Sequence, residues 1–259
     1  MHYAGAPCPP WDYTYRLTRD FTITYLESRG VALRSASILE IGCAEGGNLC
    51  ALAERGAAEL VGTDISAARL ARAREIADSL GLRIDFRQHE LGRDPEPEPW
   101  RRHFDLVLLR DVLEHIDDPV AALRAVAGLL RPGGLAYVTF PPYYSPFGGH
   151  QQTLATWRAA LPFVHLLPER AFELLAESGR AADRAEVRRI RRIRLTIAHF
   201  RKAAREAGLR VREERLYALR PVFRVRYGLP VLGADLLRNV PGLREVAALE
   251  AAYLLGPGS

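Results

Sequence analysis

The chain has 259 residues, 48% of them apolar, and a formal net charge of +5 from 36 basic and 31 acidic side chains. No apolar run approaches the roughly 20 residues that a membrane-spanning helix needs, and the N-terminus lacks the basic and apolar regions of a signal peptide. Cys8, Cys43 and Cys50 have neither metal-ligand nor disulfide spacing, so we expect no metal site and a cytoplasmic protein with one core and insertions.

Residues 1–36 are predicted to form an N-terminal segment outside the main pattern of the chain. Trp11, Tyr13 and Tyr15 lie among prolines in a stretch that we expect to be irregular, followed by a helix from about Arg19 to Ser28. These aromatic residues either fold over a bound ligand as a lid or pack on the sheet, and the sequence leaves both open. Aromatic ring faces would suit a cationic ligand.

A strand, a glycine-rich turn and a helix follow one another between residues 37 and 56. The apolar residues on both sides of Glu40 predict a strand that is buried on both faces. Gly42 and Gly46 permit a tight turn that directs backbone N–H groups to the carboxyl edge of a parallel sheet. A phosphate would gain nothing from the carboxylate of Glu40, and the turn lacks the Lys-Ser/Thr of a phosphate-binding loop. The pattern favours a ligand that carries an ammonium group.

The next predicted strand, Glu59–Asp64, ends in an acid about twenty residues beyond the glycine turn. Asp64 is therefore placed to accept hydrogen bonds from ribose hydroxyls at the edge of the sheet. The alternative is that its carboxylate only caps the following helix, for which Ser66 is also a suitable cap. Ile65 lies between these two residues.

Strands and helices continue to alternate as far as residue 140. Further strands are expected at Leu82–Gln88, Phe104–Leu109 and Leu135–Phe140. This alternation predicts an α/β protein whose Rossmann-like, doubly wound and mostly parallel sheet occupies residues 37–140 and is covered on both faces.

Four motifs in this core resemble the class I S-adenosylmethionine-dependent methyltransferases. They are Glu40-x-Gly42-x-x-x-Gly46, the acid Asp64, the run from Phe104 through Val112-Leu113-Glu114-His115-Ile116, and Arg131-Pro132-Gly133-Gly134. They are similar to the motifs of the ubiquinone- and menaquinone-biosynthesis type of small-molecule methyltransferase. The resemblance covers residues 37–140.

The resemblance implies S-adenosylmethionine as the cofactor and assigns residues to it. Glu90 would contact the adenine amino group, with His89 as the alternative, and Asp111 would form part of the wall around the methionine end. The full set implied for the cofactor is Glu40, Gly42, Cys43, Gly46, Asp64, Ile65, Glu90, Leu91 and Asp111.

Residues 141–195 are predicted to form a substrate loop and a helical cap over the acceptor. A hydroxyl acceptor needs a base, and His150 follows Gly148-Gly149 on the loop that leaves the fifth strand. His150 is our candidate base, and the alternative is that it anchors the loop. The predicted pocket residues are Tyr143, Tyr144, His115, Trp157 and His165, of which His115 either shuttles a proton or ties down its loop and His165 is a second candidate base.

The chain beyond residue 195 is predicted to complete the core. A helix is expected at Thr196–Ala207 and the sixth strand at Leu209–Leu219. Val246–Leu255 fits either a final antiparallel strand or a helix, after a second insertion at 221–244. These elements give the last predicted part of the chain, 196–259.

Our expectation is methyl transfer to a small-molecule acceptor, at a hydroxyl oxygen, in biosynthetic or tailoring metabolism; nitrogen and carbon acceptors stay open, as does a homodimer. A first alternative is a nucleic-acid methyltransferase that uses the seven arginines between Arg180 and Arg194, although a solvated helix face explains this cluster as well. Pro141-Pro142-Tyr143 follows the wrong strand for the motif of enzymes that methylate base amino groups. A second alternative is a non-catalytic protein that binds the cofactor. A nicotinamide enzyme is disfavoured by the glycine spacing.

Overall fold

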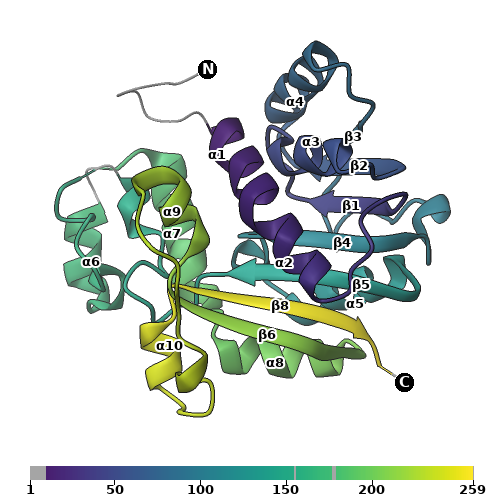
Figure 1. The fold of residues 1–259 in the computed structure, drawn as a ribbon. Coiled ribbons are helices and arrows are strands. Elements are labelled where there is room, and N and C mark those ends of the chain that lie inside the picture. Colours follow the sequence, from purple (N-terminus) through teal and green to yellow (C-terminus); the bar gives the residue numbers. More distant parts are fainter. Residues whose placement is uncertain (1–9, 155, 177–178, 259) are drawn as a thin grey trace.

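The computed structural model describes residues 10–154, 156–176 and 179–258, and a single sheet forms the centre of the described chain (Figure 1). Its strands are β1 (Ser37–Ile41), β2 (Glu59–Asp64), β3 (Asp85–Gln88), β4 (Phe104–Arg110), β5 (Leu130–Phe140), β6 (Leu209–Leu219), β7 (Leu232–Gly233) and β8 (Glu250–Pro257). They are arranged in the order β3-β2-β1-β4-β5-β8-β6-β7. The first five strands of this order, β3, β2, β1, β4 and β5, pair in parallel, and β8 runs antiparallel to both β5 and β6. The predicted doubly wound sheet with an antiparallel final strand is confirmed.

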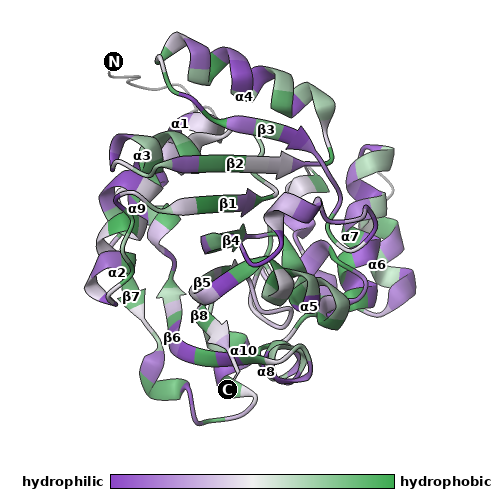
Figure 2. Cartoon of the chain, turned by 90° about the vertical axis from the view of Figure 1, so that its right-hand side faces the viewer, coloured by the Kyte–Doolittle hydropathy of each residue, from purple (hydrophilic) through white to green (hydrophobic). Residues whose placement is uncertain are grey.

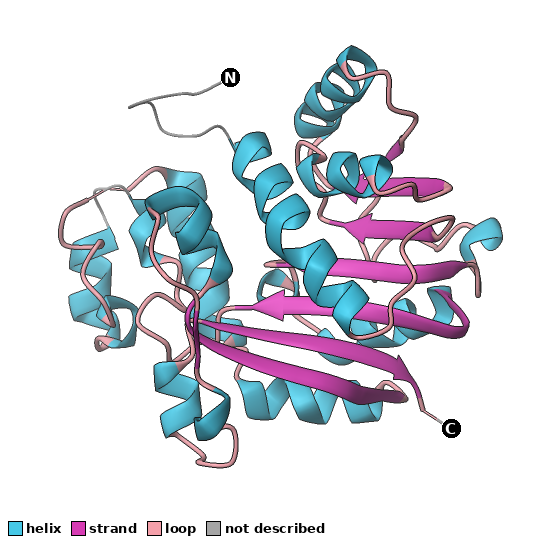
Figure 3. Ribbon diagram, viewed as in Figure 1, coloured by secondary structure: helices cyan, strands magenta, loops and turns pink. Residues whose placement is uncertain are grey.

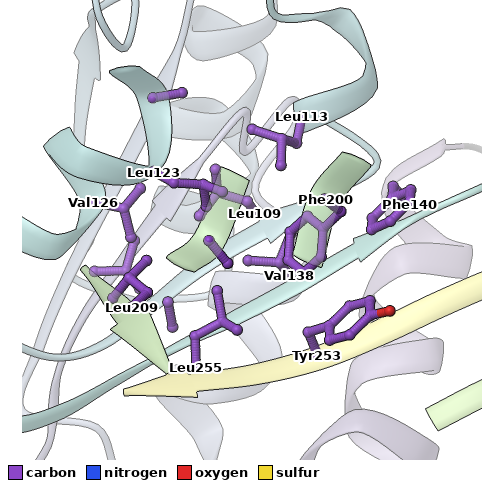
Figure 4. Packing of buried hydrophobic residues seen from close by; sticks show 14 of the residues in the cluster. Leu109, Leu113, Leu123, Val126, Val138, Phe140, Phe200, Leu209, Tyr253 and Leu255 are labelled. Atoms are coloured by element: carbon purple, nitrogen blue, oxygen red, sulfur yellow. The ribbon is translucent and has the colours of Figure 1, made fainter. Parts of the chain in front are cut away.

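The helices cover both faces of this sheet (Figure 3). They are α1 (Pro10–Leu17), α2 (Ile23–Ser28), α3 (Gly47–Glu54), α4 (Ala67–Ser79), α5 (Pro119–Leu129), α6 (Glu169–Ala176), α7 (Ala181–Ile193), α8 (Ile197–Glu206), α9 (Pro221–Tyr227) and α10 (Leu243–Ala247). One buried cluster joins α5 and α8 to the sheet, and Figure 4 shows Val126 and Phe200 packing near Val138 and Leu255. A second cluster joins α2, α3 and α4 to the other face. Figure 2 shows the mixed colours of an amphipathic helix along α4.

The N-terminal segment departs from our expectation, because it is helical from Pro10 to Ser28 in the described part of the chain. The predicted irregular stretch before Arg19 was wrong. Proline suits the first turn of a helix, where its missing N–H is not needed, and Trp11 stacks on Tyr15 one turn later with ring centroids 5.0 Å apart. Residues 1–9 of the segment, including Cys8, lie outside the described residues.

The order in which successive strands are added to the sheet reverses between β1 and β4, which are parallel neighbours. Strand order in an open α/β sheet creates a crevice at this point, beyond the carboxyl ends of the strands. In Figure 1 the helices α6, α7 and α9 lie beyond the end to which the β5 arrow points. The turn after β1 and the loop after β4 therefore meet under these insertions.

Three smaller differences concern the ends of elements. The third strand begins at Asp85 and not at Leu82, and the fifth begins at Leu130 and not at Leu135. The segment Val246–Leu255, which fitted strand or helix, is divided between α10 and β8. Ala251 and Ala252 of β8 are fully buried between β5 and β6, so pairing on both sides outweighs the helix preference of alanine. No helix in the described ranges is long and apolar enough to cross a membrane.

Candidate functional site

A cavity of about 600 Å³ opens at the carboxyl edge of the sheet. Its walls come from α1, the turn after β1, the end of β4, the loop after β5 and α9. Five residues predicted from the sequence line it: Glu40, Gly42, Cys43, Asp111 and His150. Four of the predicted cofactor residues and the candidate base, which come from distant parts of the sequence, thus share one cavity.

The side chain of Glu40 is buried in this wall, with 1% of its surface exposed. One carboxylate oxygen accepts a hydrogen bond from the amide of Asn48, and the other, Oε2, has no hydrogen-bond partner in the described structure. Burial raises the pKa of Glu40 to about 7. A buried acceptor without a partner is costly, and an ammonium group would supply both the missing donor and the opposite charge. The site therefore fits a ligand with an amino-acid end.

Two threonines of the N-terminal helix belong to a hydrogen-bond network that supports Asn48, the partner of Glu40. Thr18 donates from Oγ1 to the Asn48 side-chain oxygen at 2.6 Å. Arg110 Nη1 donates to the hydroxyls of Thr18 and Thr22 at 3.1 and 3.2 Å. The two threonines lie in a π-helical turn, Thr18–Thr22, and such turns are frequent at functional sites. Sequence reasoning missed this network, since neither residue type nor spacing marks it.

The glycines of the turn are required by close packing. Gly42 and Gly46 have φ values of +72° and +77°. A Cβ atom would lie 2.5 Å from the Val112 side chain at Gly42 and 2.8 Å from the ring of Phe86 at Gly46. Both substitutions would strain the backbone and push the loop after β4 or the β3 strand away.

The carboxylate of Asp64 holds the two loops that flank it. It accepts hydrogen bonds from the backbone N–H of Ala44 at 3.0 Å and of Ser66 at 2.8 Å. Ser66, and not Asp64, caps α4, because its side chain accepts from the backbone N–H of Arg69, so the alternative that Asp64 only caps this helix was wrong. Asp64, Gly46 and the exposed Ile65 are not among the cavity-lining residues, and the ribose contact stays a prediction.

The end of β3 lies away from the cavity as well. Glu90 forms an ion pair with Arg93 at 3.1 Å, and its backbone N–H donates to Asp94. His89 is buried with its ring 5.6 Å from that of Trp100, and Leu91 belongs to the core. The adenine contact predicted for Glu90 stays a prediction, and the packing of His89 favours a structural role for it.

His150 lines the cavity in a left-handed backbone conformation, with φ of +54°. Its Nε2 lies 3.8 Å from Oε1 of Glu114, and its ring centroid lies 5.1 Å from that of His115. Burial, assisted by His115, lowers the pKa of His150 to about 4. The imidazole is therefore neutral at pH 7 and has a nitrogen lone pair that can accept a proton, and the lowered pKa makes it a weaker base than an ordinary histidine.

Glu114 and His115 lie behind His150. Burial raises the pKa of Glu114 to about 8. Burial lowers the pKa of His115, but the hydrogen bond with Glu186 and the nearby carboxylates together outweigh burial, and the net shift is upward. Ligand atoms of Glu114, His115 and His150 lie within 4.8 Å of one another, a spacing that three ligands of one cation also have. His115 does not line the cavity itself.

Asp111 lines the cavity, and its carboxylate forms an ion pair with Arg220. Its carboxylate accepts from Arg220 Nη2 at 2.6 Å, and Arg220 also bonds Glu250 at 2.9 Å. Burial raises the pKa of Asp111, but the charges of Arg220 and Arg110 and the hydrogen bond from Arg220 together outweigh burial and hold the pKa below its usual range. Asp111 thus connects the end of β4 to the start of α9.

The other predicted pocket residues lie in the cap and away from the cavity wall. His165 is fully buried and its Nε2 donates to the carbonyl of Tyr143 at 2.7 Å. Tyr144 is partly exposed, and Trp157 has 74% of its surface exposed. These contacts show that His165 and Tyr143 hold the loop. The acceptor contacts expected of Tyr143, Tyr144 and Trp157 stay predictions.

The arginines of α7 pair mostly with acids of this chain. Arg188 pairs with Glu173, and both Arg189 and Arg192 pair with Asp117 at 3.3 and 2.8 Å. Further pairs are Arg180 with Asp183 and Arg191 with Glu169. This arrangement favours the solvated, paired helix face over a nucleic-acid surface.

Many residues of the cavity wall were not predicted from the sequence. They are Tyr13, Thr14, Leu17, Ala44, Asn48, Arg69, Arg110, Pro141, Ser145, Phe147, Gln152, Arg220, Val222, Phe223, Arg226, Tyr227 and Leu249. The aromatic character of the N-terminal segment was a signal for Tyr13. No local pattern marked Arg220, directly before the insertion 221–244, or Arg226 within it, because contacts across the fold bring them to the cavity.

Comparison with known proteins extends this description. A family model described as a methyltransferase domain matches residues 13–214. A ubiquinone biosynthesis O-methyltransferase of Marinobacter nauticus is 36% identical over 122 residues, which cover 45% of this chain and 48% of that protein. The chain thus matches about half the length of such curated relatives.

Solved structures show the same fold. An S-adenosylmethionine-dependent methyltransferase from Clostridium acetobutylicum gives a TM-score of 0.58 at 14% identity, over 95% of this chain and 92% of the other. The magnesium protoporphyrin IX methyltransferase from Synechocystis, solved with bound S-adenosylhomocysteine, gives 0.57 at 16% identity over 100% and 88%. At these identities the likeness concerns the fold.

Proposed function

Because this chain belongs to the family of methyltransferase domains, we propose that it transfers the methyl group of S-adenosylmethionine to a hydroxyl oxygen of a small molecule in biosynthetic or tailoring metabolism. The observation that carries the proposal is the neutral imidazole of His150, which shares one cavity with the buried carboxylate of Glu40. The first group can accept a proton and the second can recognise an amine.

Glu40, the glycine turn and Asp111 would hold the cofactor, which supplies an activated methyl group when bound. The free oxygen of Glu40 accepts from the amine, and the network of Asn48, Thr18 and Arg110 fixes the carboxylate before the ligand arrives. A carboxylate that is fixed in advance costs less ordering on binding.

His150 removes the acceptor proton in this proposal. A phenolic or alcoholic hydroxyl is a weak nucleophile, and a base within hydrogen-bond reach raises the electron density on its oxygen. The left-handed backbone at His150 is uncommon for a residue with a side chain, and such strain is often retained at functional sites.

The chemistry of the walls supports a small, flat acceptor. Tyr13, Phe147, Phe223 and Tyr227 give the cavity an aromatic lining, to which the rings of a phenol can pack. Its volume of about 600 Å³ is that of a small-molecule site. The curated relatives carry the name O-methyltransferase, which supports oxygen over nitrogen or carbon as the acceptor atom.

The test is methylation of catechol as a probe acceptor, followed by mass spectrometry of the product. We expect a singly O-methylated product, and we expect His150→Ala to lower kcat by about 100-fold or more, the lower range of general base catalysis. His199→Ala, at an exposed position on α8, is the matched control. Full O-methylation of catechol by His150→Ala would overturn the role of His150 as the base; carbon methylation, which needs less from a base, would be indicated by a carbon-methylated product that forms at the wild-type rate in this variant.

The two rivals make different predictions. A nucleic-acid methyltransferase would bind DNA or RNA with an affinity that falls steeply with salt. A non-catalytic protein would bind S-adenosylhomocysteine tightly and methylate no member of a panel of phenols, alcohols and amines. The internal pairing of the α7 arginines counts against the first rival.

A further inference from the structure

The side chain of Glu114 is buried behind the proposed base and has no hydrogen-bond partner. Its exposed surface is 2%, and both carboxylate oxygens lack a partner within the part of the chain that the structure describes. Such a group is costly, and a buried polar atom without a partner calls for a functional reason. The short helical turn Leu113–His115 places it beside two imidazoles.

These side chains form a line of alternating acids and bases. Nε2 of His150 and Nε2 of His115 both lie 3.8 Å from the same oxygen, Oε1 of Glu114. Nδ1 of His115 is hydrogen-bonded to Glu186 of α7, whose side chain is 41% exposed. The line therefore begins at the cavity wall and ends in solvent.

We propose that Glu114, His115 and Glu186 conduct to solvent the proton that His150 takes from the acceptor hydroxyl. This inference rests on the proposed function, because it gives that reaction an exit for its proton. The steps of 3.8 Å exceed a hydrogen bond and require a small movement of the carboxylate or one bridging water.

The balance of the reaction requires such an exit. The O–H bond of the acceptor breaks and its proton goes to His150, while the new O–C bond forms and the C–S bond of the donor breaks with its electron pair staying on sulfur. His150 then passes a proton from Nε2 to Glu114, which protonates His115 at Nε2. His115 gives its Nδ1 proton to Glu186, which releases it to water, so one proton leaves per methyl group.

Asp111 is also near His150 but cannot serve as this relay. Its carboxylate is committed to Arg220, whose charge holds the pKa of Asp111 low. Glu114 has no such cation in hydrogen-bond contact, and its raised pKa of about 8 lets it take up and give up a proton near neutral pH. The charged groups that act on Glu114, His115, His150 and Glu186 are these four themselves with Asp111, Arg189 and Arg220.

The experiment compares Glu114→Gln and Glu186→Gln with the control Glu173→Gln, which removes an α6–α7 ion pair outside the line. The probe is catechol at saturating S-adenosylmethionine, with kcat measured in a bulky, poorly penetrating buffer. We expect both line variants to lose about tenfold in kcat with unchanged KM, and millimolar imidazole to restore much of it by carrying the proton itself. The control should keep the wild-type rate with and without imidazole.

A second readout does not depend on turnover. In Glu114→Gln with S-adenosylhomocysteine bound, NMR should show His115 titrating in a single step, because the neighbouring carboxyl, whose own ionisation near neutral pH is coupled to that of His115 in the wild type, has gone. Glu186→Gln replaces a partly exposed side chain, so it keeps the test valid should Glu114→Gln unfold.

The outcomes separate the two proposals. The proton path is overturned if Glu114→Gln and Glu186→Gln both keep the wild-type kcat and imidazole does not change it. If His150→Ala is inactive in the same assay, the proposed function still stands. No methylation of any hydroxyl by the wild-type protein overturns the proposed function. Loss of activity in EDTA that Mn²⁺ restores would also overturn the path, because the same three side chains would then be ligands of a cation.

Discussion

The amide of Asn48 donates to one oxygen of Glu40 and leaves the second oxygen of that buried carboxylate without a partner. The glycine turn after β1 connects the two residues, so the strand that presents the acid and the helix that orients it are consecutive elements. This half-satisfied pair is the feature of the structure that most directly indicates an amino-acid ligand.

Replacing Glu40 with Gln should weaken binding of S-adenosylhomocysteine about 10- to 100-fold, since losing a charge-assisted hydrogen bond costs ~1.5–3 kcal/mol. Because the pKa of Glu40 is about 7, wild-type affinity should also fall as the pH drops below 7 and the carboxylate becomes neutral. Titration calorimetry measures both effects. Glu59→Gln, which removes the His103 pair at the start of β2, is the control, and equal affinity of the Glu40 variant would exclude an amine contact.

Gly42→Ala should destabilise the fold more than Gly81→Ala, although both glycines have positive φ. A Cβ at Gly42 would meet Val112, whereas nothing lies within 4 Å of one at Gly81. We expect a loss in the free energy of unfolding of about 3 kcal/mol at Gly42 and about 1 kcal/mol at Gly81. Urea denaturation measures the difference, and equal losses would mean that the loop after β4 yields freely.

His165 should make stability depend on pH in the acid range. Burial lowers its pKa from 6.5 to about 4, so between these values the unfolded chain binds more protons than the folded one. The free energy of unfolding that this shift contributes is therefore fully present above pH 6.5. It is lost as the pH falls towards 4, and the loss reaches about 3 kcal/mol. His165→Gln keeps an N–H donor for the Tyr143 carbonyl, and its unfolding free energy should change less between pH 6.5 and 4. The control His199→Gln changes an exposed histidine and should keep the pH dependence of the wild type. An unfolding free energy of His165→Gln that falls as steeply with pH as those of the wild type and the control would contradict this prediction.

Arg220→Met should be costly, because it leaves Asp111 and Glu250 close together without their cation. Breaking a buried pair on one side typically costs about 3–5 kcal/mol. Adding Asp111→Asn and Glu250→Gln should recover part of that loss, which thermal or urea unfolding of the single and triple variants would show. A triple variant less stable than Arg220→Met alone would mean that the carboxylates are held by other contacts.

The core was predictable because its signals are local. Apolar runs around Glu40 and before Asp64 mark buried strands. The turn after Glu40 needs positive φ angles at two positions, and glycine is the residue type that adopts them most readily. The same holds for α8, where Thr196 caps the helix through its side chain. In these places residue type alone carries the structural information.

The rest of the site depends on contacts between distant segments. Arg220 directly precedes the insertion 221–244, and its partners are acids 109 residues upstream and 30 residues downstream. Trp157 has the residue type of a pocket wall, yet it is exposed, because burial depends on how the cap settles on the sheet. The helix from Pro10 was missed since prolines and aromatics suggested a turn, and its stability comes from packing on α3.

The packing of the N-terminal helix on Gly47 ties access to the cavity to the folding of that helix. A side chain at Gly47 would collide with Thr14 and with the carbonyl of Trp11, so α1 rests directly on the backbone of the turn. Tyr13, Thr14 and Leu17 of the same helix line the cavity. We therefore expect ligand exchange to involve displacement of this helix, and hydrogen–deuterium exchange of its amides to slow when a ligand fills the cavity.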